Sequence, residues 1–219
     1  MDVNSEFHLD VLPDEQLKLF NMLSAQSFIK DFYLAGGTSL ALQIGHRRSV
    51  DFYFFIPADF DTSLIVNKIT ETGVYQRENE EKNTINGNLN GVSISFFGYR
   101  YGIIDSFRHY NNIRLAGIKD IAAMKLEAIA GRGSKKDFVD LFFLLQMYTI
   151  DEMFTFHSQK YGHELSNQYH HLKSLVYFDD AEMEVMPVMV KSLKWNDVKK
   201  RIVNCTKESM VYKNIYGNL

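Results

Sequence analysis

The order of apolar and polar positions predicts two kinds of structure along this chain. Short apolar or alternating stretches, typical of strands, occur up to about residue 117, and a helical period of apolar positions follows. We therefore expect an α/β (α+β) core with a mixed or antiparallel sheet in residues 1–117. An all-helical lobe in residues 118–219 is expected to pack on that core.

In the first part, the pattern alternates between helices and strands. Three helices are predicted, over about residues 14–30, 38–44 and 61–72. Strands are predicted over residues 32–35, 50–56, 74–80, 83–89 and 92–97. Thr38 or Ser39 is expected to cap the second helix, because hydroxyls accept hydrogen bonds from the first turn. The pair Asn90-Gly91 is typical of a tight type I′ hairpin turn.

In the second part, the apolar positions keep a helical period throughout. Helices are predicted over about residues 118–131, 135–147, 151–160, 163–174 and 194–210. No apolar run approaches the roughly 20 residues that cross a bilayer, so we expect no membrane-spanning segment.

Composition narrows the class of protein but does not identify its partners. The 219 residues, of which 46% are apolar, can form a substantial core in one domain or in one domain with a helical extension. A net charge of -3 gives no general attraction to nucleic acid. The single cysteine, Cys205, cannot form an intrachain disulfide, and the first residues lack a signal-peptide pattern. The cytoplasm is therefore the expected compartment.

A glycine pair provides the first candidate site. A predicted strand ends at Gly36-Gly37, and the hydroxyl residues Thr38 and Ser39 open the next helix. Glycine lets a ligand approach the backbone closely, and the N–H groups at a helix start attract an anion. The same residues also describe an ordinary tight turn followed by a capped helix, so both interpretations stay open.

The next strand carries a candidate metal ligand. Because side chains alternate along a strand, Asp51 and Tyr53 share one face, while Phe52 and Phe54 share the other and are expected to face the core. Two carboxylates at positions 51 and 53 would suit Mg²⁺, which prefers hard anionic oxygen ligands. The phenol of Tyr53 is neutral at cellular pH and is a far poorer ligand.

Four segments of the chain resemble the nucleotidyltransferase family of the AbiEii/AbiGii abortive-infection toxins. In order, they are Gly36–Leu42, His46–Phe52, Ile118–Arg132 and Lys135–Leu145. The resemblance implies a polymerase-beta-like nucleotidyltransferase fold that uses an NTP and Mg²⁺. It implies transfer of NMP to an RNA, such as a tRNA, or to a protein acceptor, and a genetically linked antitoxin regulator as partner.

The resemblance also implies roles for single residues. Those that would bind the triphosphate are Gly36, Gly37, Thr38, Arg48 and Ser49, and the metal ligand would be Asp51. The second acid of the family falls on Tyr53. The third usually lies on a neighbouring strand, where this sequence offers Ser93 and Ser95 in place of a carboxylate. Glu78 or Glu80 on the preceding strand could substitute.

The helical part carries further candidates. A helix over residues 118–131 would align Ile121, Lys125, Ala128 and Arg132 in one stripe. Such cations either reach water along the edge of the core or, as the resemblance implies for Lys125, contact a phosphate. Asp137 could be a capping acid at a helix start. By the resemblance it could instead orient Lys125 or accept a proton from the attacking group.

Two other features of the helical part allow only weak interpretations. His163, His170 and His171 lie close in sequence, but neither a cysteine nor a His-x-x-x-His pair accompanies them, so their spacing does not indicate zinc. A basic face on residues 194–207 could touch RNA, although such a face is more often simply solvated.

Two functions from different classes follow from the sequence. The first is an enzyme that transfers NMP from an NTP to an RNA or protein acceptor, with Asp51, Lys125 and Asp137 as its catalytic residues. The second is a catalytically degenerate member, with Tyr53 in place of the second metal carboxylate, that acts as a nucleotide-binding or regulatory module.

Overall fold

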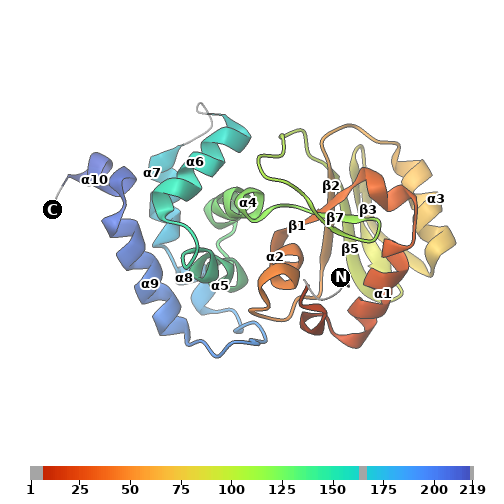
Figure 1. The fold of residues 1–219 in the computed structure, drawn as a ribbon, viewed down its shortest axis with the longest axis horizontal. Coiled ribbons are helices and arrows are strands. Elements are labelled where there is room, and N and C mark those ends of the chain that lie inside the picture. Colours follow the sequence, from red (N-terminus) through yellow and green to blue (C-terminus); the bar gives the residue numbers. More distant parts are fainter. Residues whose placement is uncertain (1–6, 163–166, 218–219) are drawn as a thin grey trace. The chain divides into compact units, whose positions relative to one another are not determined.

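The computed structural model describes residues 7–162 and 167–217 and contains two compact units (Figure 1). The first unit consists of the chain up to Gly102 together with Ser106–Gly117, and the second of Ile103–Asp105 together with the chain from Ile118 onward. The two units are described separately below.

A buried carboxylate explains why a short segment belongs to the second unit. The side chain of Asp120 accepts hydrogen bonds from the backbone N–H groups of Ile104 at 3.2 Å and Asp105 at 2.9 Å. Asp120 also forms a 2.7 Å ion pair with Lys160, and both side chains are fully buried. The hydrogen bonds hold Ile103–Asp105 against Asp120, and the ion pair joins Asp120 to Lys160.

A seven-stranded mixed sheet forms the frame of the first unit, in the order β3-β4-β5-β2-β1-β7-β6. Its strands are β1 (Tyr33–Ala35), β2 (Phe52–Ile56), β3 (Tyr75–Glu81), β4 (Thr84–Leu89), β5 (Val92–Gly98), β6 (Arg108–Tyr110) and β7 (Ile113–Leu115). The pairs β1–β7 and β2–β5 are parallel, and the others are antiparallel. The predicted mixed sheet is confirmed.

Three hairpin turns join consecutive strands of this sheet, and each contains an asparagine with a positive φ, at Asn83, Asn90 and Asn111. Asn90 and Gly91 have φ values of 52° and 80°, as the predicted type I′ turn requires. The β6–β7 hairpin turns at Asn111, with φ 49°, and was not predicted. Its three-residue strands are too short to show an alternating pattern.

The helices of the first unit are η2 (Leu9–Val11), α1 (Asp14–Ser24), η3 (Phe28–Asp31), α2 (Gly36–Ile44) and α3 (Thr62–Thr72). The prediction of one helix over residues 14–30 is wrong beyond Ser24. In a continuous helix, Ile29 would lie about 120° around the axis from Leu23. The turn into η3 instead lets both residues enter the core, where each is fully buried.

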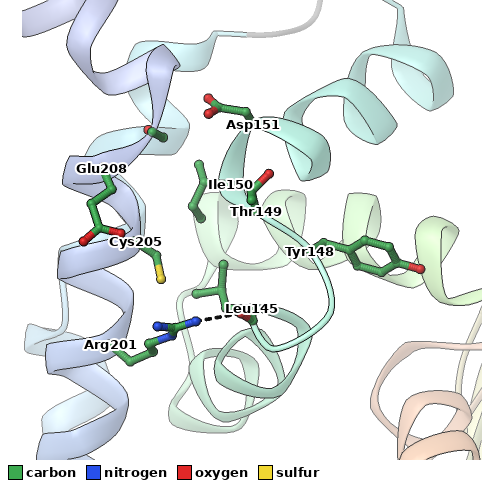
Figure 2. Close-up of a pocket in the computed structure, with 9 residues that line it drawn as sticks. Leu145, Tyr148, Thr149, Ile150, Asp151, Arg201, Cys205 and Glu208 are labelled. Atoms are coloured by element: carbon green, nitrogen blue, oxygen red, sulfur yellow. Dashed lines mark hydrogen bonds between the residues drawn. The ribbon is translucent and has the colours of Figure 1, made fainter.

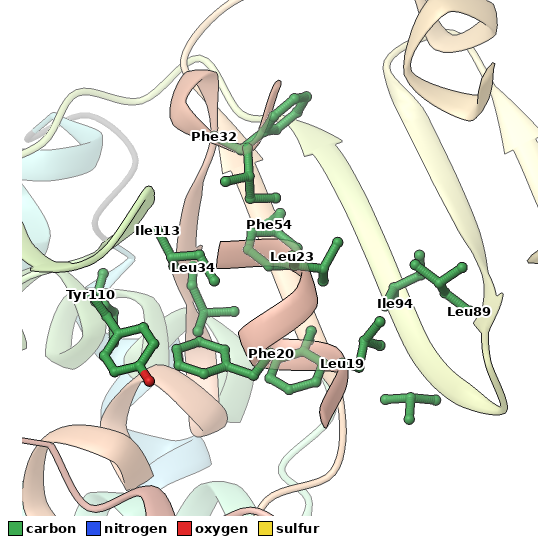
Figure 3. Packing of buried hydrophobic residues seen from close by; sticks show 14 of the residues in the cluster. Leu19, Phe20, Leu23, Phe32, Leu34, Phe54, Leu89, Ile94, Tyr110 and Ile113 are labelled. Atoms are coloured by element: carbon green, nitrogen blue, oxygen red, sulfur yellow. The ribbon is translucent and has the colours of Figure 1, made fainter. Parts of the chain in front are cut away.

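The core of the first unit lies between one face of the sheet and helices α1 and α3, and Figure 3 shows the part beneath α1. Phe20 of α1 stacks on Phe52 of β2 at a ring distance of 5.9 Å, and Phe54 stacks on Phe96 of β5 at 5.0 Å. Phe52 and Phe54 are fully buried, as predicted. Because side chains alternate along β2, Tyr53 projects from the opposite face.

The second unit is helical in its described residues, apart from turns and loops. Its helices are α4 (Ile118–Gly131), α5 (Lys135–Leu144), α6 (Ile150–Tyr161), α7 (Gln168–Leu175), α8 (Asp179–Glu182), α9 (Trp195–Glu208) and α10 (Met210–Tyr216). Residues 163–166 of the predicted fourth helix lie outside the described part. None of the helices within residues 7–162 and 167–217 combines the length and apolar content that a membrane crossing requires.

Candidate functional site

The glycine turn, Gly36 and Gly37, lies where β1 passes into α2. Gly36 has a φ of 73°, a left-handed conformation that glycine adopts without strain. Helix α2 begins at Gly36, and Ala35 is its N-cap without a side-chain hydrogen bond. The prediction that Thr38 or Ser39 caps this helix is therefore wrong.

Thr38 instead connects α2 to the segment before β2. Its hydroxyl donates to the backbone carbonyl of Asp51 and lies 2.7 Å from the hydroxyl of Ser49. Because Thr38 has a single hydroxyl proton, Ser49 is the donor in the second contact. Both side chains are almost fully buried. These contacts place Asp51 next to the first turn of α2.

The ring of Tyr53 packs against the glycine turn. In the sheet, Tyr53 pairs with Ala35 of β1 and Ser95 of β5. A Cβ atom added to Gly36 would lie 3.7 Å from Cδ2 of Tyr53. Asp51, which is half-buried, comes one residue before β2. The aromatic ring therefore lies beside the glycines, at the strand position onto which the resemblance places a second acid.

These residues by themselves fit a resident Mg²⁺ ion poorly. Asp51 offers a carboxylate, whereas Tyr53 and its neighbour across the strands, Ser95, offer only neutral oxygens. Mg²⁺ in proteins usually relies on one or two carboxylates together with water and substrate phosphates. A metal ion is therefore expected here only together with a triphosphate that supplies further oxygens.

The order of the sheet excludes Glu78 and Glu80 as substitutes for a missing acid. Both lie on β3, which is separated from β2 by β4 and β5. Three strand spacings amount to roughly 14 Å. Glu78 accepts a 2.6 Å hydrogen bond from Asn88, and Glu80 forms a 3.1 Å ion pair with Arg77.

Arg48 and Ser49 have different surroundings although they are neighbours in sequence. Ser49 is buried against Thr38. Arg48 is exposed and lines a hollow of about 490 Å³ beside the start of α1, where Leu12 and Asp14 also contribute. The contact of Arg48 with a triphosphate, which the resemblance implies, stays a prediction.

In the second unit, Lys125 is the centre of a buried ionic network. Its Nζ lies 2.8 Å from Oδ1 of Asp137 and 2.6 Å from Oδ2 of Asp140. Arg132 donates to Asp137 through Nε at 2.9 Å, and the Ser134 hydroxyl donates to the same carboxylate at 2.6 Å. We call these five residues the lysine–carboxylate network. Lys125 of α4 and Arg132, one residue past the end of that helix, thus both reach Asp137, as the predicted stripe requires.

The surroundings of Asp137 favour a positioning role. Burial by itself would raise the pKa of this carboxyl, but the charges of Lys125 and Arg132 outweigh burial and hold the pKa below its ordinary value. Both oxygens already accept hydrogen bonds. A carboxylate so held is a weak base, and the geometry is that of a group that orients Lys125. Asp140, which sequence reasoning missed, lies three residues after Asp137 on α5.

Another cluster in the second unit joins residues that are far apart in sequence. His157 and His171 both approach Oε1 of Glu127, at 2.5 and 2.9 Å. His170, next in sequence, instead lies 3.2 Å from the carbonyl of Ala130. Glu127, His157 and His171 come from three different helices. No local spacing in the sequence could therefore have indicated this cluster.

A cavity of about 180 Å³ lies between α9 and the start of α6 (Figure 2). Arg201 donates to the Leu145 carbonyl at 3.1 Å. The Asp151 carboxylate accepts from the backbone N–H groups of Met210 and Val211. Burial raises the pKa of the Cys205 thiol, which makes it a weak nucleophile. These groups serve helix packing, and we assign the cavity no function.

Comparison with known proteins places the chain in a family. No model of a protein family matches it. The protein of Aquifex aeolicus (strain VF5) named "Uncharacterized protein aq_aa25" is 40% identical over 180 residues, which make up 80% of this chain and 86% of that protein. The chain belongs to the aq_aa25 family.

Solved structures show which fold this member of the aq_aa25 family has. The crystal structure of JHP933 from Helicobacter pylori has a TM-score of 0.55 and 15% identity, covering 93% of this chain and 94% of JHP933. MenT4, a nucleotidyltransferase toxin from Mycobacterium tuberculosis, has a TM-score of 0.52 and 14% identity, covering 92% and 88%. At these identities the likeness concerns the fold alone, and it confirms the predicted nucleotidyltransferase-like fold.

Proposed function

We propose that this protein is a toxin-type nucleotidyltransferase. It binds an NTP, as the magnesium complex, at the glycine turn and transfers NMP to an RNA or protein acceptor. The observation that carries the proposal is the left-handed Gly36 at the start of α2, with Asp51 held nearby through Thr38. Unpaired N–H groups at a helix start favour an anion, and glycine leaves room for its approach.

The toxin assignment has two supports of different kinds. The nucleotidyltransferase-like fold is shared with a toxin, MenT4. Four segments of the sequence also resemble the AbiEii/AbiGii toxins in the same order. A genetically linked antitoxin regulator is part of this proposal, because the resemblance implies one.

The proposed reaction is a single nucleotidyl transfer. An acceptor hydroxyl oxygen forms a bond to the α-phosphorus, the bond from that phosphorus to the α–β bridging oxygen breaks, pyrophosphate leaves with that oxygen, and the hydroxyl proton passes to water. Asp51 would bind the magnesium ion of the incoming complex, because Thr38 holds its backbone next to the first turn of α2 and its side chain is a carboxylate. The catalytic roles of Lys125 and Asp137 that the resemblance implies stay predictions.

A second candidate is a nucleotide-binding or regulatory module without transfer activity. The observation that favours it is the ring of Tyr53 beside Gly36, with Ser95 paired to Tyr53 across the strands. Losing a metal ligand removes charge stabilisation from a transition state, whereas nucleotide binding to backbone groups can persist.

Separate measurements of binding and transfer distinguish the two candidates. Binding of each NTP with Mg²⁺ is followed by calorimetry, and transfer by incubation with α-labelled NTP and total RNA. We expect label on RNA or protein, loss of label in Asp51→Ala, and more label in Tyr53→Asp. Tyr53→Phe is the matched control, because it keeps the ring and adds no charge.

Each result decides between the candidates. Nucleotide binding without label, together with label gained only in Tyr53→Asp, contradicts the enzyme and supports the module. Failure of the wild-type protein to bind any NTP, or binding that Asp51→Ala and Gly36→Val leave unchanged, contradicts both, because both place the triphosphate at the glycine turn.

A further inference from the structure

Three helices of the second unit bring two imidazoles and a carboxylate to one point. Glu127 comes from α4, His157 from α6 and His171 from α7. One nitrogen of each ring and one carboxylate oxygen all lie within 4.8 Å of one another. His157 is fully buried and His171 is 5% exposed, while the side chain of Glu127 is 44% exposed. The two histidines are therefore held in place by their burial, and the cluster is accessible to solvent through Glu127.

The hydrogen bond at the far side of His171 fixes which of its nitrogens faces the cluster as a ligand. Nδ1 lies 3.0 Å from the carbonyl of Asn167, which can only accept, so Nδ1 carries a proton. In a neutral ring, Nε2 then presents a lone pair to the Glu127 carboxylate at 2.9 Å. Two acceptors at this distance require a positive charge between them, either a proton on Nε2 or a metal ion.

Histidines that bind metals commonly show the same outer contact. A ligating imidazole almost always donates its other N–H to a carbonyl or carboxylate, which sets the tautomer and the ring orientation. Asn167 provides this carbonyl one turn before His171 on the same helix. The backbone carbonyl of Asn167 therefore gives His171 the outer hydrogen bond that metal-binding histidines usually have.

His157 brings a second ring nitrogen to the same oxygen. Its Nε2 lies 2.5 Å from Oε1 of Glu127, and the two histidine rings are 4.7 Å apart between centroids. Within the described residues, Nδ1 of His157 has no hydrogen-bond partner. His157 therefore lacks the outer contact that His171 has, and a metal ion that binds its Nε2 would replace the proton that this nitrogen shares with Glu127.

We propose that Glu127, His157 and His171 bind a divalent transition-metal ion of the zinc type, with water completing its coordination. Two imidazoles and one carboxylate form a ligand set that Zn²⁺ takes when one position is left open to water. Ligand atoms around a tetrahedral Zn²⁺ lie roughly 3.3 Å apart, so the Glu127 oxygen needs to move away from the His157 nitrogen by about 0.8 Å and from the His171 nitrogen by about 0.4 Å. The exposed side chain of Glu127 can make this adjustment.

The ion would connect α4, α6 and α7, and the inference does not rest on the proposed function. All three ligands lie in the second unit, whereas the glycine turn lies in the first. The donor set also separates the two sites chemically, because imidazole nitrogen suits Zn²⁺ and not Mg²⁺.

Titration of the chelator-treated full-length protein with Zn²⁺ tests the inference. We expect one equivalent to bind in calorimetry, and Co²⁺ to give the visible absorption of a low-coordinate site. Glu127→Gln and His157→Gln should each weaken binding at least about tenfold, since loss of even an outer contact costs 10–100-fold. His170→Gln is the matched control, because this exposed neighbour of His171 faces Ala130, and it should leave affinity unchanged.

A measurement on the wild-type protein avoids any dependence on the folding of variants. On adding Zn²⁺, the ¹⁵N resonance of His171 Nε2 should shift while Nδ1 keeps its proton. The inference is overturned if no equivalent of Zn²⁺ or Co²⁺ binds, if Glu127→Gln binds as tightly as wild type, or if His170→Gln weakens binding equally. The cluster would then consist only of hydrogen bonds between Glu127 and the two histidine rings.

Discussion

Replacement of Lys125 by methionine tests the lysine–carboxylate network directly. Lys125 lies 2.8 and 2.6 Å from the carboxylates of Asp137 and Asp140, and none of the three side chains is more than 5% exposed. Methionine keeps the apolar stem and removes the charge. Removing one partner of a buried ion pair costs about 3–5 kcal/mol, because the other charge stays buried without compensation.

The partners that Asp137 keeps in Lys125→Met decide where between about 3 and 5 kcal/mol the loss of stability should fall. Arg132 and Ser134 still donate to Asp137 when Lys125 is absent. We therefore expect a loss near the lower end, about 3 kcal/mol in the free energy of unfolding.

The pH dependence of this loss has a defined sign. The pKa of Asp137 is lowered in the folded protein, so the ionised carboxylate contributes stability above its unfolded pKa of about 3.9 and loses it as pH falls. Lys125→Met removes the largest attraction, so burial should raise the folded pKa of Asp137. Because the folded pKa then lies nearer the unfolded value, the variant should lose less stability than the wild type as pH falls below about 4.

The single tryptophan provides the assay. Trp195 packs on Phe138 and Phe178 inside the second unit, so its fluorescence reports the unfolding of that unit in urea. Lys200→Met, an exposed position on α9, is the control and should change stability by no more than about 0.5 kcal/mol. An unchanged urea midpoint in Lys125→Met at pH 5 and pH 7 would refute the reasoning.

Two further predictions concern the first unit and its backbone. Gly36→Ala should lower the free energy of unfolding by about 1–2 kcal/mol. The loss comes from the left-handed φ, because the added Cβ makes only an ordinary contact. Gly131→Ala is the control and should lose no stability in thermal denaturation, because its added Cβ meets open space. Asp61 accepts a 3.1 Å hydrogen bond from the Leu64 N–H at the start of α3. Asp61→Ala should therefore cost about 1 kcal/mol in urea unfolding and Asp61→Asn much less, and equal losses in the two variants would contradict a capping role.

Features that depend on neighbouring residues could be predicted from the sequence. The strand, helix, strand order around the glycine turn was predicted, as were the Asn90-Gly91 hairpin and the helix capped by Asp61. Each follows from a local period, a cap or a turn residue, which act within a few positions of the chain. The cap at Thr38 was wrong because α2 begins two residues earlier, at Gly36, so Thr38 lies inside the helix and its hydroxyl instead donates to Asp51, 13 positions away.

What the sequence alone determined was therefore the succession of elements, the alternation that buries Phe52 and Phe54, and the candidate residues. The tertiary structure alone decided that β2 lies between β1 and β5, which puts Tyr53 beside Gly36 and opposite Ser95. It also decided that Glu127 meets two histidines from other helices. These contacts join residues distant in the chain, and they arise from side-chain packing, which no local period encodes.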